Sequence, residues 1–172
     1  MIKRLDMIIR RLRSNPKLPA DYRVFINDII KHGEGEAVSN DEVNPKYVWY
    51  IPHHGVYHQK KPDKLRVVFD CSAKYKGTCL NDHLLQGPNL TNSLIGVLCR
   101  FREDPVAIMG DIEPMFHQFR VNAEDRVYLR FLWRPDGDLN TEPSVYQTNV
   151  HLFGSTSSTG RANYARKKCE RL

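Results

Sequence analysis

Residues 106–119 constrain the fold of this chain more than any other segment, because an apolar run ends there next to a carboxylate. Residues 106–109 form a short apolar run, which is typical of a buried strand. Asp111 follows after a glycine, and Pro114 stands where the first turn of a helix tolerates a missing N–H. The sequence therefore predicts a buried strand over 106–110, Asp111 at the edge of a cleft, and a helix after it.

The Asp111 carboxylate has two interpretations at such a position. It can hold a hard cation, since Mg²⁺ takes oxygen ligands from one or two carboxylates together with substrate phosphates. It can equally be a strand-end residue that caps the following helix. The rest of the sequence has to distinguish between them.

The N-terminal residues predict two amphipathic helices. Their apolar stripes keep helical spacing, and packing into the core is the simplest interpretation of both. The first stripe is Ile2, Leu5, Ile8, Ile9 and Leu12, and the second is Tyr22, Phe25, Ile26, Ile29 and Ile30. Residues 15–19 break the helical pattern between them, and Gly33 is a predicted C-cap. A polar loop over 33–45 follows.

Residues 47–51 and 65–69 are predicted to be two strands, joined through a lysine-rich turn at 58–64. Such a turn suits a triphosphate or a template backbone, and it is also what an ordinary solvated turn contains. Farther along, residues 84–101 begin with a Gly-Pro break and predict a helix that starts at Thr91 or Asn92 and packs under the sheet. Residues 127–133 and 145–153 predict a strand and its returning partner.

Composition limits the function classes only modestly. The 172-residue chain has a formal net charge of +6, which is compatible with binding to nucleic-acid phosphates. Its 4 cysteines include no Cys-x-x-Cys pair, which argues against a zinc ribbon or a disulfide scaffold and suits a reducing compartment. There is no run of about 20 apolar residues and no signal-peptide core. We expect an intracellular protein, cytoplasmic or nuclear, with no membrane partner.

Several blocks of residues occur in a fixed order along the chain. They are Trp49-Tyr50-Ile51-Pro52-His53-His54-Gly55-Val56, Lys64-Leu65-Arg66-Val67-Val68-Phe69-Asp70-Cys71-Ser72-Ala73-Lys74, Leu80-Asn81-Asp82-His83-Leu84-Leu85-Gln86-Gly87-Pro88, the Asp111 segment, and Val150-His151-Leu152-Phe153-Gly154-Ser155-Thr156-Ser157-Ser158 followed by Ala162-Asn163-Tyr164-Ala165. In these blocks the chain resembles the reverse transcriptase of BEL/Pao-type LTR retrotransposons.

The resemblance implies an α+β fold, namely part of the right-hand polymerase fold with a mixed or antiparallel sheet and packed helices. It divides the chain into a helical N-terminal region (1–46), a fingers-like region (47–105) and a partial palm (106–172). Asp111 corresponds to the first catalytic aspartate of the family and to a ligand of Mg²⁺ or Mn²⁺ in the complete enzyme.

The resemblance also implies residues that contact the dNTP or the template. Lys64 and Arg66 lie in the fingers, and the spacing of Arg66 to Asp70 matches the family pattern. Phe116 falls on the sugar-gate position, where an aromatic ring fills the space of a ribose 2′-hydroxyl; a core aromatic on a helix is the alternative.

A further segment, Phe153-Gly154 with the pair Ser157-Ser158, matches the floor under the incoming nucleotide. Glycine allows close backbone approach there. The family usually has Pro after the serine pair, whereas this chain has Thr159, which implies a looser turn.

The implied activity is RNA-directed DNA polymerisation, a metal-dependent nucleotidyl transfer from dNTPs to a template-primer of RNA or DNA. The remaining catalytic aspartates of the family belong to a Tyr-x-Asp-Asp motif, which does not occur between Phe153 and Leu172. We therefore expect the 172-residue chain alone to be inactive, and activity to need other polyprotein segments: the palm remainder, thumb, ribonuclease H and integrase.

Two alternatives remain open. The chain can be a nucleic-acid-binding remnant without chemistry, whose affinity falls steeply with salt. It can also be a non-functional transposon relic, whose truncated palm would expose apolar sheet surface.

Overall fold

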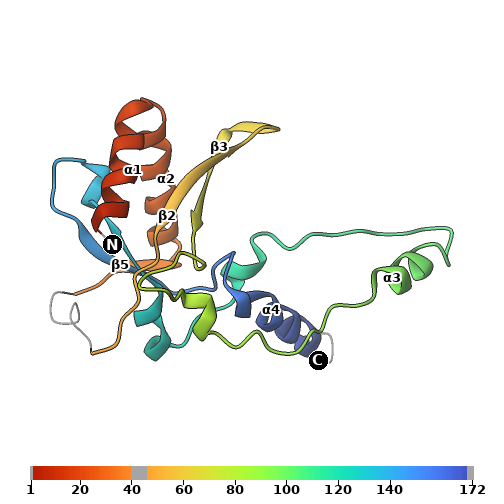
Figure 1. Cartoon of the computed structure of the whole chain (residues 1–172). Helices are drawn as coiled ribbons and strands as arrows, with labels where there is room; N and C mark the ends of the chain where they lie inside the picture. The colour runs from red at the N-terminus through yellow and green to blue at the C-terminus, as the bar shows by residue number, and fades with distance from the viewer. Residues whose placement is uncertain (1, 40–45, 170–172) are drawn as a thin grey trace.

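The computed structural model describes residues 2–39 and 46–169. Figure 1 shows helices together with antiparallel strands, in agreement with the predicted α+β class. The helices are α1 (Ile2–Ser14), α2 (Leu18–Lys31), α3 (Leu94–Phe101) and α4 (Thr156–Cys169), with 3₁₀ turns η2 (Leu80–His83), η3 (Met115–Gln118), η4 (Ala123–Leu129) and η5 (Pro135–Gly137). The strands are β1 (Gly35–Ala37), β2 (His53–His58), β3 (Lys61–Phe69), β4 (Arg130–Trp133) and β5 (Ser144–Thr148). Within the described residues, none of the helices has the length and apolar content needed to cross a membrane.

Both N-terminal helices are confirmed, and each buries most of its predicted apolar stripe, whereas Ile30 is exposed. The buried side chains are Leu5, Ile9 and Leu12 of α1 and Leu18, Tyr22, Ile26 and Ile29 of α2. The predicted cap at Gly33 is also confirmed, since this residue has a φ of 65°. Its N–H donates to Ile30 O at 2.9 Å and that of Glu34 donates to Ile29 O at 2.8 Å, which together end α2 in a Schellman motif.

The predicted basic hairpin is present, but the predicted position of its first strand is wrong. Antiparallel β2 and β3 pair His53 with Phe69 and Tyr57 with Leu65, whereas residues 47–51 are not a strand and make a single bridge between Tyr50 and Arg130. The histidine-rich composition of β2 concealed the strand, because a buried polar residue such as His53 needs hydrogen-bond partners that the sequence does not reveal.

A second antiparallel sheet has the order β1-β5-β4. The strands predicted over 127–133 and 145–153 are confirmed only in part, because β4 begins at Arg130 after the 3₁₀ turn η4 and β5 ends at Thr148. The predicted loop 33–45 contains β1, which pairs with β5, and residues 40–45 of that loop lie outside the described part of the chain.

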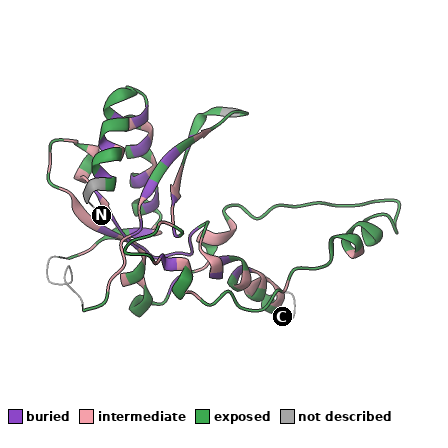
Figure 2. Cartoon of the chain, viewed as in Figure 1, coloured by how far each residue is buried: buried purple, intermediate pink, exposed green. Residues whose placement is uncertain are grey.

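Five rings, here called the aromatic core, join α2 to both sheets. They are Tyr22, His53, Phe69, Phe131 and Trp133. Tyr22 stacks on Trp133 with ring centroids 4.8 Å apart, and Phe69 meets Phe131 edge-on at 5.1 Å. The Tyr22 hydroxyl donates to His53 Nδ1, and His53 Nε2 donates to Leu132 O at 3.0 Å. Buried residues are concentrated around these elements in Figure 2.

Residues 85–114, here called the arm, extend away from this core and carry α3 (Figures 1 and 2). The predictions for the arm are wrong in two respects. α3 has no buried residue and does not pack under the sheet, and residues 101–114 are all exposed, with no strand over 106–110. An apolar run becomes a buried strand only when another strand satisfies its backbone groups, and neither described sheet offers one. The helix predicted after Asp111 is reduced to η3, which Pro114 precedes.

Candidate nucleic-acid interface

The hairpin presents Lys64 and Arg66 to solvent because β3 alternates its side chains. Both residues are exposed, whereas Leu65 between them is buried against the core. This is the period-2 pattern of a strand with one covered face. Among the described residues, neither cation takes part in an ion pair. The two charges are therefore accessible to an external phosphate.

The hairpin is anchored to α2 by contacts that also neutralise an acid near its turn. Lys17 donates to Asp63 at 2.9 Å, and this bond holds the pKa of the Asp63 carboxyl below its usual range. The Tyr57 hydroxyl donates to Asp21 at 2.7 Å. Burial, and to a smaller extent this bond, raises the pKa of Tyr57 to about 12. The tip therefore keeps its basic character while the hairpin is held against α2.

Gly154 lies at the base of the hairpin and has a positive φ that favours glycine. Its φ is 104°, and a Cβ would lie 3.4 Å from Phe69 O at the end of β3. Asn81 fixes this turn from a third segment, because its side-chain amide donates to Gly154 O at 3.0 Å and its amide oxygen accepts from Thr156 N–H at 2.9 Å. The family resemblance had identified the block that contains Asn81, but the clamping role of this residue had no sequence signal.

Two predicted site residues from different elements lie together. The rings of Phe116, in η3, and Phe153 have centroids 5.6 Å apart at 54°. Phe116 is half-buried and Phe153 is exposed. Phe116, Phe153 and Gly154 thus form one surface next to the base of the hairpin.

The serine pair predicted for the floor of the site is buried. Ser158 Oγ donates to Leu152 O at 2.8 Å, while Ser157 and Ser155 hydroxyls lie 3.1 Å apart. Beside them is a cavity of about 120 Å³ whose polar lining includes His151 and Arg161. Burial and then the nearby Arg161 charge lower the pKa of His151. The two serine side chains therefore lie in the interior at the start of α4, where Ser158 bonds the backbone of the preceding segment.

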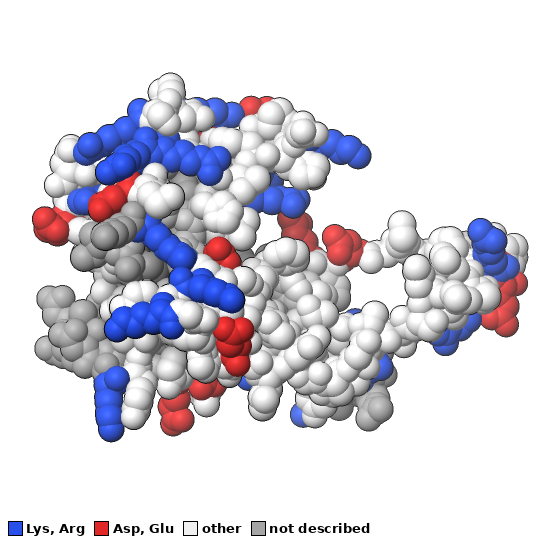
Figure 3. Space-filling view, viewed as in Figure 1, with Lys and Arg blue, Asp and Glu red and all other residues white. Residues whose placement is uncertain are grey.

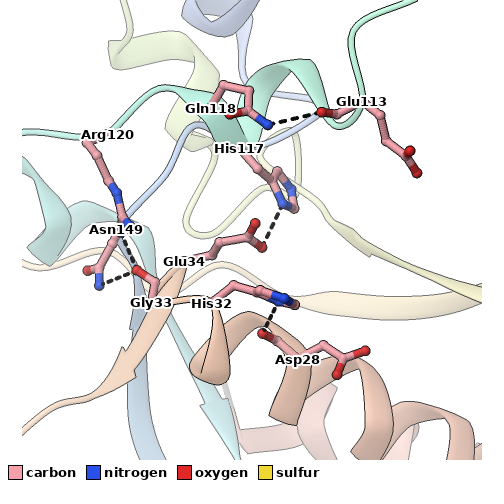
Figure 4. A network of polar contacts seen from close by, with 9 residues as sticks. All are labelled: Asp28, His32, Gly33, Glu34, Glu113, His117, Gln118, Arg120 and Asn149. Atoms are coloured by element: carbon pink, nitrogen blue, oxygen red, sulfur yellow. Dashed lines mark hydrogen bonds and ion pairs between the residues drawn. The ribbon is translucent and has the colours of Figure 1, made fainter.

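A polar network that the sequence did not predict positions η3 (Figure 4). His117 Nδ1 donates to the Glu34 carboxylate at 2.9 Å. Arg120 donates to Gly33 O, and Asn149 Nδ2 donates to the same carbonyl at 3.2 Å. η3 is thereby tied to the end of α2, and this attachment sets the place of Phe116.

Asp111 lies in the arm and is exposed. Among the described residues, its carboxylate makes a single hydrogen bond, with the N–H of Ile112 at 3.0 Å. Within residues 2–39 and 46–169, no group of 3 or more His, Cys, Asp or Glu side chains could hold a metal ion. The donor set described around Asp111 does not fit the two-metal centre that the resemblance implies, because such a centre needs several converging carboxylates.

No protein-family model matches the chain, and no curated protein matches it.

Proposed function

We propose that this chain is the fingers and first palm portion of an RNA-directed DNA polymerase of the BEL/Pao retrotransposon type, and that it grips a template-primer and a dNTP. The supporting observation is the meeting of separate segments at one surface. Gly154 lies against the end of β3, Asn81 clamps it, and Phe153 contacts Phe116. The resemblance assigns Phe116 and the Phe153-Gly154 segment to the nucleotide site.

The hairpin supplies the electrostatic part of this proposal. Lys64 and Arg66 are exposed on the strand that ends beside Gly154. Lysine offers a mobile point charge and arginine a planar fork, and both suit phosphate oxygens. Such contacts fix the position of a nucleic acid without reading its sequence.

Binding to a labelled template-primer at several salt concentrations tests the proposal. We expect Lys64→Ala and Arg66→Ala each to weaken binding and to lower the salt slope by about 1. Lys31→Ala is the matched control, because Lys31 is an exposed lysine at the end of α2. Equal behaviour of the hairpin variants and the control would refute the assigned role of the hairpin.

The environment of Asp111 favours a second candidate function, which is binding without chemistry. An exposed carboxylate with no described cluster of metal-binding groups gives no scaffold for nucleotidyl transfer. A primer-extension assay with Mg²⁺ or Mn²⁺ tests whether the chain by itself carries out any nucleotidyl transfer. The 172-residue chain should show binding without incorporation, and template-dependent incorporation would refute this expectation.

A further inference from the structure

A cavity of about 320 Å³ lies on the body of the protein and is not used by the interface described above. Aromatic rings and cations line it together: Trp49, Tyr50 and Tyr75 supply the rings, and Arg4 and Lys74 supply the charges. This volume is at the small end of the range of roughly 300–1,000 Å³ for ligand sites. Among the described residues, no Asp or Glu lines it.

The walls of the cavity are held by backbone bonds to the rest of the fold. Trp49 N–H donates to Val127 O at 3.2 Å. Tyr75 and Thr78 exchange backbone bonds of 2.7 and 3.2 Å across a tight turn. Lys76 and Gly77 occupy that turn with φ values of 50° and 90°, as a type I′ turn requires. The rings that line the cavity therefore lie on segments fixed before any ligand arrives.

Arg4 connects the cavity to α1. Its guanidinium donates to Lys74 O at 2.9 Å, and the apolar stripe of α1 is buried, so that the other face of the helix points outward. That face presents Arg10, Arg11 and Arg13, all exposed. Figure 3 shows Lys and Arg side chains gathered over the α1 end of the molecule.

Asp82 lies near Lys74 and modifies this charge. Asp82 accepts from Cys79 N–H at 2.9 Å. The bonds from Cys79 are the main reason that the pKa of Asp82 is lowered, and Lys74 contributes a smaller attraction. These bonds keep Asp82 ionised, so its negative charge offsets part of the positive charge of Lys74, and Arg4 remains as the cavity's other cation.

We propose that this cavity takes one base of single-stranded nucleic acid, stacked on its aromatic wall, while Arg4, Lys74 and the arginines of α1 hold the adjoining phosphates. The inference rests on the proposed function in one respect, that the chain works on nucleic acid. Stacking on aromatic side chains together with a basic track is how single strands are bound without sequence preference. A base paired within a duplex cannot enter such a cavity, so the site selects unpaired nucleotides.

Intrinsic tryptophan fluorescence offers a direct readout. The chain has 2 tryptophans, and Trp133 is buried in the aromatic core with 3% exposure, whereas Trp49 lines the cavity. We expect a single-stranded oligouridylate of about ten nucleotides to quench Trp49 saturably, and the affinity to fall with salt.

Matched variants locate the site. Tyr75→Ala should weaken binding about tenfold through lost stacking, and Lys74→Ala should lower the salt slope by about 1. The controls are Tyr164→Ala and Lys168→Ala on α4, whose side chains are likewise exposed. Because all four side chains lie at the surface, we expect every variant to keep the fold.

Three results would overturn the inference. The first is equal binding by the cavity variants and their α4 controls. The second is heparin, a polyanion without bases, quenching Trp49 as strongly as the oligonucleotide. The third is uridine monophosphate binding as tightly as the oligonucleotide, which would assign the cavity to a free nucleotide.

The outcomes also separate this inference from the proposed function. If Lys64→Ala and Arg66→Ala weaken template-primer binding while the cavity variants leave single-strand binding unchanged, the cavity assignment fails and the proposed interface stands. If the cavity variants lose single-strand binding while Lys64→Ala and Arg66→Ala leave template-primer binding unchanged, the cavity stands and the hairpin assignment fails.

Discussion

The aromatic core and the arm are both rich in large apolar side chains, but they differ sharply in burial. Trp133 in the core is 3% exposed, whereas Ile108 and Met109 in the arm are 92% and 88% exposed. The core rings come from α2, the hairpin and β4, which are far apart in the sequence. An apolar run indicates that a segment favours burial, but it does not specify which other segment covers it.

The largest expected difference between the two regions is in the free energy of unfolding. Trp133→Ala removes a ring stacked on Tyr22 and should cost about 3–5 kcal/mol. Ile108→Ala removes an exposed side chain and should change stability by less than about 0.5 kcal/mol. Urea unfolding midpoints at unchanged m-value measure both. Similar losses would show that the arm packs against something in solution.

Acid should destabilise the core through His53. Burial lowers the pKa of His53 to about 4, while an unfolded histidine has a pKa of about 6.5. Between these values the unfolded state binds more protons, so this contribution is complete above pH 6.5 and is lost as the pH falls toward 4. The total is of order 3 kcal/mol. The arm contains no histidine, so no histidine titration there adds to this slope.

Two variants isolate this effect in unfolding measurements across pH. His53→Phe should flatten the slope, and His58→Gln, which changes an exposed hairpin histidine, should preserve it. The lowered pKa of the buried His151 acts in the same direction, so a residual slope is expected in His53→Phe. An unchanged slope in His53→Phe would contradict the assignment.

Two glycines extend the comparison to the effect of adding a methyl group, one in the core and one in the arm. At Gly55 a Cβ would lie 2.9 Å from Leu65 Cδ1 and 3.2 Å from Tyr22 Cε2. Gly55→Ala should therefore cost about 1–3 kcal/mol by overpacking. At Gly110 in the arm nothing lies within 4 Å, so Gly110→Ala should be neutral or slightly stabilising. Thermal unfolding of the pair measures the difference, and an equal loss at both sites would contradict it.

The sequence predicted those elements whose pattern is local. Both N-terminal helices and the Gly33 cap follow from spacing within one segment and were confirmed. β2 was placed too early because His53 is a core residue only through Tyr22 and Leu132, which are distant along the chain. The strand over 106–110 was wrong for the reverse reason, since its apolar pattern is present and a pairing partner is not described.

The same limit applies to the candidate site. Exposure of Lys64 and Arg66 follows from strand alternation around Leu65 and could be predicted. The contact of Phe116 with Phe153 joins two segments whose spacing in sequence carries no geometric signal, and only the resemblance had assigned them to one site. The clamp by Asn81 could not be predicted, because an amide has many partners and only the fold selects among them.

The smallest predicted effect lies where the arm rejoins the core, at the pair of His117 and Glu34. Their side chains are 27% and 20% exposed, so solvent screens the interaction, and we expect a coupling of about 1 kcal/mol or less. A double-mutant cycle with His117→Gln and Glu34→Gln isolates it from the backbone bonds of Glu34. The coupling should shrink as salt is added. A coupling near zero would mean that Arg120 and Asn149 suffice to hold η3, so that Phe116 keeps its place beside Phe153 without the ion pair.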